Sequence, residues 1–462
     1  MKPINKNYMK TTSLLNKYNV PGPRYTSYPT VPYWDVNSFS LKLWQESLQQ
    51  RFTESNTKDG ISLYIHLPFC EQMCTFCGCN KRITKRHEVE LPYIKALLKE
   101  WHLYRNIFGR KPKIKEMHLG GGTPTFFSPE NLDYLIREIL RHSDLAEDYE
   151  FSFEGHPNNT TAAHLETLSW LGFKRVSYGV QDYSETVQKA IHRVQPFKNV
   201  ARTTLQARAF GFTSVGHDLI FGLPFQTLED VKNTIEKTLQ LRPERIAFYS
   251  YAHVPWIKGN GQRGFDETNL PSGAAKRAMY QLGKEMLEAR GYKEIGMDHF
   301  ALPKDSLYKS VQHQQLHRNF MGYTASKTQL MIGLGVSAIS DSWYGFSQNV
   351  KGVGEYQALL ENDILPAFRG HILTQEDQII RKHILNLMCD FKTSWDAGLY
   401  FPEIPEVLNR LAEMEKDGLC EISGNGIQIT TEGIPFVRNI CMAFDLLLQR
   451  KYPKSQLFSM TV

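Results

Sequence analysis

Cys70-Glu71-Gln72-Met73-Cys74-Thr75-Phe76-Cys77 carries three thiols, separated by three residues and then by two. Thiolates at this spacing can bind three irons of an iron–sulfur cluster. One iron is then left without a protein ligand, and a substrate or cofactor can bind there. The spacing therefore indicates a cluster that takes part in chemistry. Cys79 lies too close behind Cys77 to be an obvious fourth ligand.

Zinc binding and disulfide formation are the alternatives for these thiols. A zinc site usually combines two Cys pairs, or Cys with His, from separate places in a chain. The other cysteines, Cys389, Cys420 and Cys441, lie near the C-terminus without paired spacing. Disulfide frameworks are typical of short secreted chains, whereas this chain has 462 residues and seven Cys. A cluster is the favoured interpretation, and zinc or plain core Cys are the minor ones.

The composition is that of an ordinary soluble globular protein, with 41% hydrophobic and 22% charged residues. The first residues lead into no segment of signal-peptide type, and no apolar run is long enough to span a bilayer. We therefore expect a cytoplasmic protein with no membrane partner. The net charge of +6 suits an anionic substrate. Because the basic residues form no concentrated stripe, we expect no nucleic-acid partner.

Strand-like and helix-like segments alternate from about residue 60 to residue 255. The predicted strands are Ile61–Leu67, Ile114–Leu119, Tyr149–Glu154, Arg175–Val180, Thr213–Ile220 and Arg245–Tyr251. Ser128 before Pro129, and Thr227 three residues before Asp230, are typical of helix starts. Six such units predict an α/β fold, with a parallel sheet curled into a full or partial (β/α)6 TIM-like barrel. An open doubly wound sheet is the alternative, because strand order cannot be read from the sequence.

Unusual residues cluster where these strands end. Cys70 follows the first strand, Gly120-Gly121-Gly122-Thr123-Pro124 follows the second, and Glu154 ends the third. Gln181 follows the fourth, and Asp218 lies at the end of the fifth. The carboxyl ends of barrel strands open onto one face, which is where active sites lie. We therefore expect these residues to converge.

The segments before and after the barrel lack its alternation of strands and helices. An N-terminal arm, 1–55, contains the Pro-rich segment Pro21–Thr30 and is either a flexible leader or a flap over a site. The barrel and an extension occupy 56–368, and a mostly helical, winged-helix-like domain occupies 369–462. The elements predicted in that last domain are a helix at Glu403–Lys416, strands at Cys420–Ile422 and Ile427–Thr430 joined by an Asn425-Gly426 turn, and a helix at Phe436–Leu448.

The cluster run, the Gly triplet and the barrel together resemble the radical S-adenosylmethionine (SAM) enzymes. Further motifs make the chain similar, from about residue 15 to its end, to the oxygen-independent coproporphyrinogen III oxidase (dehydrogenase) family. They are Pro23–Thr30, Tyr64–Cys70, Cys77–Lys81, Gly179–Asp182, Asp218–Pro224, Gly296–Phe300, His317–Thr324, Gly335–Ser340 and Arg438–Met442.

The resemblance implies an anaerobic step of haem synthesis. Two propionates of coproporphyrinogen III lose carboxyl groups and become vinyls, giving protoporphyrinogen IX. A [4Fe–4S] cluster reduces SAM, and the resulting 5′-deoxyadenosyl radical takes a hydrogen from the propionate β-carbon. The resemblance also implies a monomer, an electron donor such as flavodoxin or ferredoxin, and an unidentified terminal acceptor.

The resemblance assigns Cys70, Cys74 and Cys77 to the cluster, with SAM on the fourth iron. Glycines let backbone groups approach a ligand, and a guanidinium binds a carboxylate in bidentate fashion, so Arg193 suits the SAM carboxylate. The SAM contacts implied are Tyr64, Phe76, Cys77, Gly78, Gly121, Gly122, Thr123, Glu154, Gln181, Arg193, Asp218, Ala252 and Ile339, divided between two SAM molecules. The residues proposed to meet substrate carboxylates are Arg24, His299 and Arg318. No catalytic residue is assigned.

One segment departs from the family pattern. Where the family usually reads Glu-x-Asp-Pro-Arg, this chain has Glu154-Gly155-His156-Pro157-Asn158. A possible Asp–Arg pair is therefore lost beside the cofactor. Two other functions stay open: a haem chaperone on the same scaffold, and a radical SAM enzyme that acts on haem itself. Cys79 and the Pro23–Pro29 arm argue against the chaperone, because such relatives tend to lack both.

Overall fold

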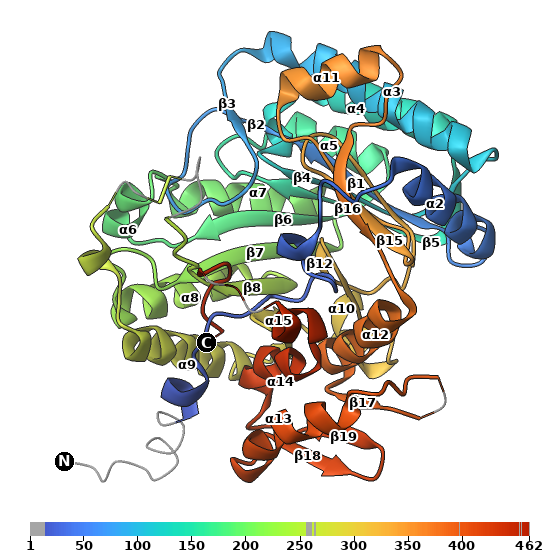
Figure 1. Ribbon diagram of the computed structural model, residues 1–462. Helices are drawn as coiled ribbons and strands as arrows, with labels where there is room; N and C mark the ends of the chain where they lie inside the picture. The colour runs from blue at the N-terminus through green and yellow to red at the C-terminus, as the bar shows by residue number, and fades with distance from the viewer. Residues whose placement is uncertain are drawn as a thin grey trace.

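A large mixed sheet forms the centre of the computed structural model (Figure 1), which describes residues 14–255, 261–262, 265–396, 398–451, 453 and 455–461. Its strand order is β16-β15-β14-β13-β1-β4-β5-β6-β7-β8-β10-β9. Among the described helices, none combines the length and apolar character that a bilayer crossing requires.

Six parallel strands lie side by side in chain order, and they are the six that the sequence predicts. They are β1 (Ile61–Leu67), β4 (Lys113–Gly121), β5 (Asp144–Gly155), β6 (Phe173–Gln181), β7 (Ser214–Phe221) and β8 (Arg245–Ser250). A doubly wound sheet would reverse direction at its first strand, so that alternative is wrong. The two sheet edges, β16 and β9, are not paired with each other, so the barrel is partial, as predicted.

Further strands extend the sheet at both edges. Strand β13 (Met331–Leu334) is parallel to β1, whereas the strands beyond it are antiparallel. The outer strands are β14 (Ile339–Asp341), β15 (Gly345–Asn349) and β16 (Ala367–Ile372) on one side, and β10 (His299–Ala301) and β9 (Lys293–Gly296) on the other. Separate short pairs are β2 (Phe69–Cys70) with β3 (Arg82–Ile83), and β11 (His317–Asn319) with β12 (Gly322–Thr324).

Helices cover the outer face of the parallel strands (Figure 1). They are α2 (Leu41–Ser55), α3 (Glu90–Phe108), α4 (Pro129–Arg141), α5 (Ala162–Trp170), α7 (Phe197–Ala209), α8 (Leu228–Leu241), α9 (Gly273–Glu288) and α11 (Val353–Glu361). Two short helices lie elsewhere: α6 (Glu185–Ala190) packs with Leu223 and Tyr251, and α10 (Ser306–Gln312) bonds to Glu150 through Ser306. The predicted caps are confirmed: the Ser128 hydroxyl accepts a hydrogen bond from the Asn131 N–H, and Thr227 and Asp230 form a capping box.

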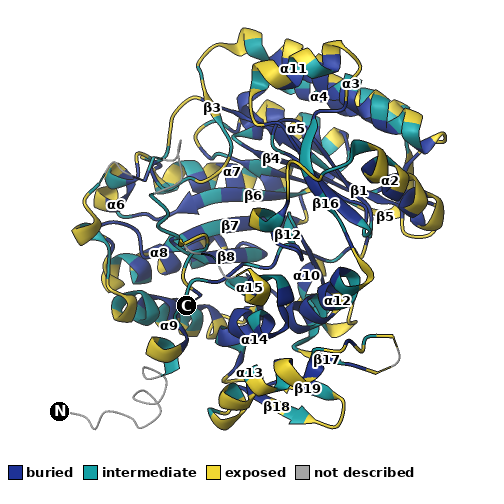
Figure 2. Cartoon of the chain, in the orientation of Figure 1, coloured by how far each residue is buried: buried dark blue, intermediate teal, exposed yellow. Residues whose placement is uncertain are grey.

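Strand alternation separates an apolar layer from a polar one. On β1, Ile61, Leu63 and Ile65 are fully buried in the core that α3 covers, while Ser62 and Tyr64 point to the other face. The other parallel strands alternate in the same way, and their buried cores stand out in Figure 2. The inner face of this barrel is therefore lined by polar side chains.

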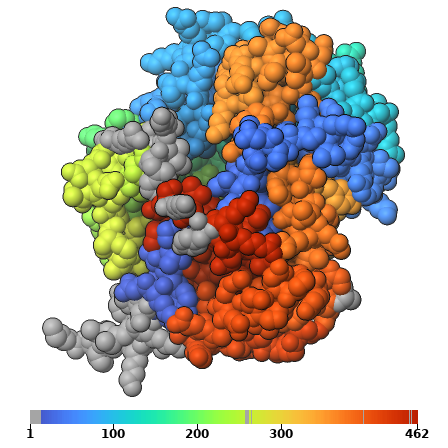
Figure 3. Space-filling model, viewed as in Figure 1, coloured from blue at the N-terminus to red at the C-terminus, as the bar shows by residue number. Residues whose placement is uncertain are grey.

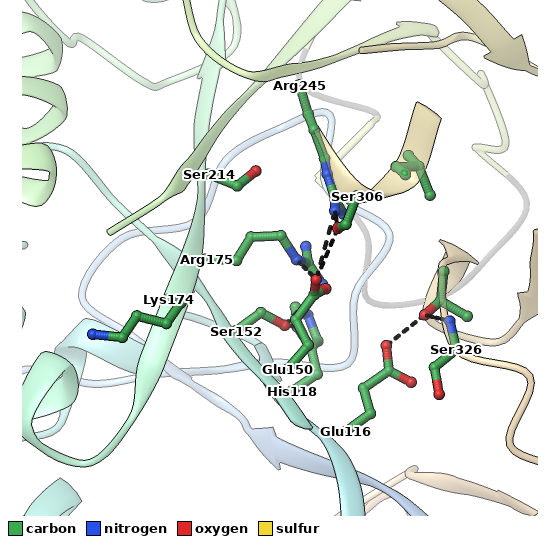
Figure 4. A network of polar contacts seen from close by, with 12 residues as sticks. Glu116, His118, Glu150, Ser152, Lys174, Arg175, Ser214, Arg245, Ser306 and Ser326 are labelled. Carbon is green, nitrogen blue, oxygen red and sulfur yellow. Dashed lines mark hydrogen bonds and ion pairs between the residues drawn. The ribbon is translucent and has the colours of Figure 1, made fainter. Parts of the chain in front are cut away.

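Buried ion pairs hold the inner face together at the amino ends of the strands (Figure 4). Glu150 accepts hydrogen bonds from Arg175 (2.9 Å) and Ser306 (3.0 Å), and lies 3.8 Å from Arg245. Arg245 is also paired with Asp305 at 2.7 Å. Burial alone would raise the pKa of Glu150, yet the two arginines lower it to about 2. The charges in the barrel interior are therefore compensated by one another.

The C-terminal part contains α12 (Gln375–Asp390), β17 (Lys392–Ser394), α13 (Ile404–Lys416), β18 (Cys420–Ser423), β19 (Gly426–Ile429), α14 (Val437–Phe444) and α15 (Leu446–Arg450). The predicted hairpin is present, but its two turn residues are Gly424 and Asn425, because Ser423 pairs with Gly426. The single helix predicted at Phe436–Leu448 is wrong: Asp445 ends α14 and caps α15 by accepting the Leu448 N–H at 2.8 Å.

Packing crosses both limits of the predicted middle segment, 56–368. Helix α2 precedes it, yet Trp44 and Phe52 are fully buried in the barrel core. Strand β16 runs through the limit at 368/369 while paired with β15. The Pro21–Thr30 segment of the arm is not a flexible leader either, since Tyr25 and Tyr28 are buried in the core of the C-terminal part. Short 3-10 helices lie at Val31–Tyr33, His87–Val89, Pro124–Phe126, Glu267–Asn269 and Ile434–Phe436.

Removing the Glu150 charge should destabilise the whole barrel. In Glu150→Gln, two interior guanidinium groups lose a shared counter-charge, which we expect to cost about 3 kcal/mol. Thermal unfolding at neutral pH measures this. Because the native pKa lies below the usual carboxyl value, the ionic contribution is present above about pH 4.5 and is lost as the pH falls towards 2.

Glu138→Gln is the matched control for this change. Glu138 forms an exposed pair with Arg141 at 3.5 Å, and such pairs contribute about 0 to 1 kcal/mol. Equal destabilisation by the two variants would contradict a structural role for the interior network.

Candidate active site

The three thiols of the cluster run are held at the carboxyl end of β1. Cys70 ends β2, and its Sγ lies 3.3 Å from the Thr123 hydroxyl. The Cys77 N–H donates to the Cys74 carbonyl at 3.3 Å, and Arg193 Nη1 lies 3.7 Å from Cys74 Sγ. The loop is therefore joined both to the segment after β4 and to the residues after β6.

The donor set fits an iron–sulfur cluster. All three thiols are free. A hydrogen bond from Cys79 lowers the pKa of the Cys77 thiol to about 6 despite its burial, and thiolate is the form that binds iron. Among the described residues, no three His, Cys, Asp or Glu side chains converge as a single metal ion requires. The thiolates of an iron–sulfur cluster lie farther apart than the ligands of a single metal ion, because each thiolate binds a different iron.

The glycines after β4 are required by packing within the protein. A Cβ on Gly121 would lie 2.6 Å from the His66 ring, and φ is +111° there. A Cβ on Gly122 would lie 2.6 Å from the Pro68 carbonyl. The segment therefore lies flat against the end of β1, so packing within the protein adds a second reason for these glycines beside the predicted approach of SAM. A Cβ on Gly78 would meet nothing within 4 Å.

A chain of hydrogen bonds runs from the interior ion pairs through Ser152 to His118 (Figure 4) and on to Glu154. Arg175 donates to the Ser152 Oγ at 2.9 Å, so the hydroxyl proton is free to go to His118 Nδ1 at 2.7 Å. The other ring nitrogen of His118, Nε2, faces Glu154 Oε1 at 3.4 Å. A proton on Nε2 is thus aimed at the carboxylate.

Glu154 is ionised and accessible. Burial would raise its pKa, but hydrogen bonds from His118 and from the Gly121 N–H (3.3 Å) lower the pKa below the ordinary value. Its side chain is 46% exposed. The carboxylate can therefore accept hydrogen bonds from a ligand at the barrel mouth. Tyr64 lies beside it, with its ring stacked on that of His118 at 6.0 Å.

Arg193 lies in the loop after α6, and Asp218 lies on β7. Arg193 Nη2 donates to the Gly179 carbonyl at 2.7 Å, while its buried Nε–H has no partner among the described residues. Gln181 is close, since a Cβ on Gly179 would contact both side chains. The Asp218 Oδ1 accepts from the Ser177 hydroxyl at 2.9 Å, and burial raises the pKa of Asp218 to about 7.

Phe76 and Ala252 are brought together by one amide. Gln262 donates from Nε2 to the carbonyls of both residues, at 3.1 and 3.0 Å. Ile339 is placed elsewhere: it lies on β14, across the sheet from Ala252, and packs against Trp34 and Phe346. The sequence-predicted contacts therefore form one group at the carboxyl ends of β1 to β8 and an outlying position on β14.

The three candidates for substrate carboxylates differ in charge. Arg24 lies 4.0 Å from Asp298, and Arg318 donates from Nη2 to the Arg24 carbonyl at 3.2 Å. His299 is not cationic at neutral pH, because burial lowers its pKa to about 4. It donates from Nδ1 to the Met297 carbonyl at 2.8 Å. His299 is therefore a half-buried, hydrogen-bonded histidine, and its proposed contact with a substrate carboxylate stays a prediction.

Comparisons with known proteins identify the family. A family model described as Radical SAM superfamily matches residues 64–238. The oxygen-independent coproporphyrinogen III oxidase of Helicobacter pylori is 40% identical over 448 residues, which cover 94% of this chain and 96% of that protein. The enzyme of the same name from Escherichia coli is 36% identical over 461 residues, covering 97% and 98%.

A solved structure agrees. The coproporphyrinogen III oxidase of Escherichia coli, described as a radical SAM enzyme, superposes with a TM-score of 0.86 at 34% identity, over 94% of this chain and 98% of that one. The chain belongs to the oxygen-independent coproporphyrinogen III oxidase family. The family predicted from the motifs is thus confirmed, and with it the [4Fe–4S] cluster and SAM as the cofactors that a radical SAM fold implies.

Within this family the chain's departure after β5 has a simple geometry. His156 Nδ1 accepts the Asn158 N–H at 3.2 Å, and the Asn158 amide donates to the Val194 carbonyl at 3.0 Å. Burial and then the charge of Arg193 lower the pKa of His156 well below its ordinary value. The uncharged turn at His156-Pro157-Asn158 thus binds Val194, the residue that follows Arg193. No Asp–Arg pair is needed for this contact.

Sequence reasoning missed the residues that support Glu154. His118, Ser152 and Arg175 lie inside strands, where a polar residue has no motif of its own. Their signal is the alternation of polar and apolar residues along β4, β5 and β6, which places them on the same face as Glu154.

Alanine at two glycines should separate packing from ligand approach. Gly121→Ala combines positive φ with a clash against His66, so we expect a loss of about 3 kcal/mol in unfolding free energy and weaker SAM binding. Gly78→Ala, in the same site but with open space around Cβ, should change stability by less than about 0.5 kcal/mol. Thermal unfolding and SAM titration test both, and an equally stable Gly121→Ala would refute the packing role.

Proposed function

We propose that this chain catalyses the anaerobic oxidative decarboxylation of coproporphyrinogen III to protoporphyrinogen IX. The observation that carries the proposal is membership of the family over 94% of the chain. It is supported by three free thiols beside the mouth of a partial barrel. The coproporphyrinogen substrate follows from the names of the relatives.

Each of the two propionates loses one hydrogen atom from its β-carbon, one molecule of carbon dioxide and one electron. The hydrogen atom and electron balance requires one SAM per propionate, one electron delivered by a donor protein such as a flavodoxin or ferredoxin, and a one-electron acceptor. When bound, the cluster and SAM supply the radical that removes the hydrogen atom.

Residues of this chain are suited to hold these groups. Cys70, Cys74 and Cys77 would bind three irons, with Arg193 beside Cys74. The accessible Glu154 carboxylate, oriented by His118 and Gly121, would accept hydrogen bonds from SAM. The remaining proposed SAM contacts are Tyr64, Phe76, Gly78, Gly122, Thr123, Gln181, Asp218, Ala252 and Ile339. A second SAM molecule would contact some of these residues.

The wider setting is proposed on the same basis. We expect a cytoplasmic monomer with three parts, 1–55, 56–368 and 369–462, of which the arm and the C-terminal part cover the barrel. Size-exclusion chromatography with light scattering tests the monomer.

An anaerobic assay tests the function. Reconstituted protein, coproporphyrinogen III, SAM and a reductant should give a product lighter by two carboxyl groups, with 5′-deoxyadenosine and methionine. If 5′-deoxyadenosine forms but the porphyrinogen is unchanged, the substrate is wrong. Tight haem binding with neither product would favour the chaperone, and a methylated or ring-opened haem would favour an enzyme acting on haem.

Two cysteine variants test the ligand assignment. Cys74→Ala should lose the cluster and all activity, because an iron loses its thiolate. Cys79→Ala should keep its full iron and sulfide content, since Cys79 acts only by hydrogen bonding to Cys77. Iron and sulfide analysis measures both, and cluster loss in Cys79→Ala would contradict the three-ligand assignment.

SAM binding should depend on pH through Asp218. Burial raises the pKa of this carboxyl to about 7, and only the ionised form accepts hydrogen bonds at both oxygens. We therefore expect SAM affinity to rise by about tenfold as the pH increases from 6 to 8. Asp218→Asn should abolish this rise. Anaerobic calorimetry measures it, and a flat profile in the unaltered protein would remove Asp218 from the site.

A further inference from the structure

A cavity of about 270 Å³ lies between the carboxyl end of β8 and the two ends of the chain. Its walls come from the segments after β7 and β8, from the start of α9, and from the N- and C-terminal segments. Figure 3 shows those terminal segments, blue and red, side by side on one face, and Gly22 donates its N–H to the Ser459 carbonyl at 3.0 Å. Ala252 is one of the lining residues.

Three basic side chains line the cavity. Arg24, His253 and Lys276 face it, and no Asp or Glu is present among the described lining residues. His253 is bonded to Glu267 at 3.0 Å. Arg24 and Lys276 therefore carry the positive charge that is available to a ligand.

Lys276 reaches the cavity over a glycine. It lies in the first turns of α9, and its stem crosses Gly222, where a Cβ would be 2.6 Å from the Lys276 Cε. Its ammonium donates one hydrogen bond, to the Tyr251 carbonyl at 2.9 Å. An ammonium has three donors, so two are left without a partner among the residues that the structure describes. Gly222 belongs to the Asp218–Pro224 motif, and this contact gives that glycine a role.

Arg24 is positioned by two buried arginines. Arg438 donates to the carbonyls of Gly22 and Pro23, the latter at 2.8 Å, and Arg318 donates to the carbonyl of Arg24 itself. Three consecutive carbonyls of the arm are thereby fixed. The Arg24 side chain is held at the cavity wall as a result.

Among the described residues, Arg24 and Lys276 share one nearby carboxylate. Asp298 lies 4.0 Å from Arg24, and its charge also acts on Lys276. Burial, and then the charge of Arg24, lower the pKa of Lys276 to about 8, which is the result expected when no carboxylate is bonded to it. In contrast, the buried Arg381 has its own carboxylate, Asp341, with Nη1 at 3.0 Å from Oδ1. One carboxylate near two cations leaves an excess of positive charge among the described residues at this cavity, which an anionic ligand would balance.

We propose that Lys276 and Arg24 bind a carboxylate of a ligand in this cavity. The proposal rests on the proposed function, which offers two sources of that carboxylate: a propionate of the porphyrinogen, or the carboxylate of a second SAM. Both fit the chemistry of an ammonium beside a guanidinium.

Lys276→Gln tests the proposal by equilibrium binding, without turnover. Reconstituted protein is titrated with coproporphyrinogen III in the absence of SAM, and separately with SAM in the absence of reductant. Loss of a charged hydrogen-bond partner should weaken one of these ligands by about 10- to 100-fold. Arg24→Gln, on a different element, should weaken the same ligand and guards against a folding defect in either variant.

Lys284→Gln is the matched control, because Lys284 lies on the same helix but is paired with Glu288 at 3.5 Å and with Glu294. Selective loss of porphyrinogen affinity assigns a propionate to the cavity. Selective loss of SAM affinity, with one fewer SAM bound per chain, assigns the second SAM. Affinities equal to those of Lys284→Gln for both ligands overturn the proposal. If the unaltered protein binds no porphyrinogen at all, the proposed function fails instead.

Discussion

The barrel depends on pairing the charges that its own strand alternation places inside. Every second residue of the parallel strands faces the helices and is apolar, so the intervening residues face inward and are mostly polar. Interior charges are costly unless they are paired and hydrogen-bonded. Glu150, Arg175, Arg245 and Asp305 compensate one another. The cost of a polar interior is thereby met at the closed end of the barrel.

That same network serves the open end. Arg175 donates to the Ser152 hydroxyl, which lies 2.7 Å from His118 Nδ1, and His118 Nε2 faces Glu154 at 3.4 Å. The carboxylate at the mouth is thus connected to the ionic layer, whose residues Figure 4 shows with Ser152 and His118. The structural ion pairs and the polar groups of the candidate site form a single network. A substitution in the ion pairs should therefore alter the hydrogen bonding of Glu154.

The chain ends close the other side of the mouth. Tyr25 is buried and donates to Asp445 at 3.1 Å, while Arg438 binds the arm through backbone carbonyls. These contacts join residues more than 400 positions apart. They form only where the tertiary structure brings the two segments together, since the partners are far apart in the chain. The arm is consequently a fixed wall of the cavity that Lys276 enters.

The sequence by itself determined the local chemistry and the elements. The spacing of Cys70, Cys74 and Cys77, the caps at Ser128 and Thr227, and the six strands depend on neighbouring residues, so they could be read along the chain. Strand order, the break at Asp445, the neutral state of His299 and the hydrogen-bond chain through His118 depend on residues that only the fold brings together. Burial and partner geometry set those properties, and both are decided by tertiary structure.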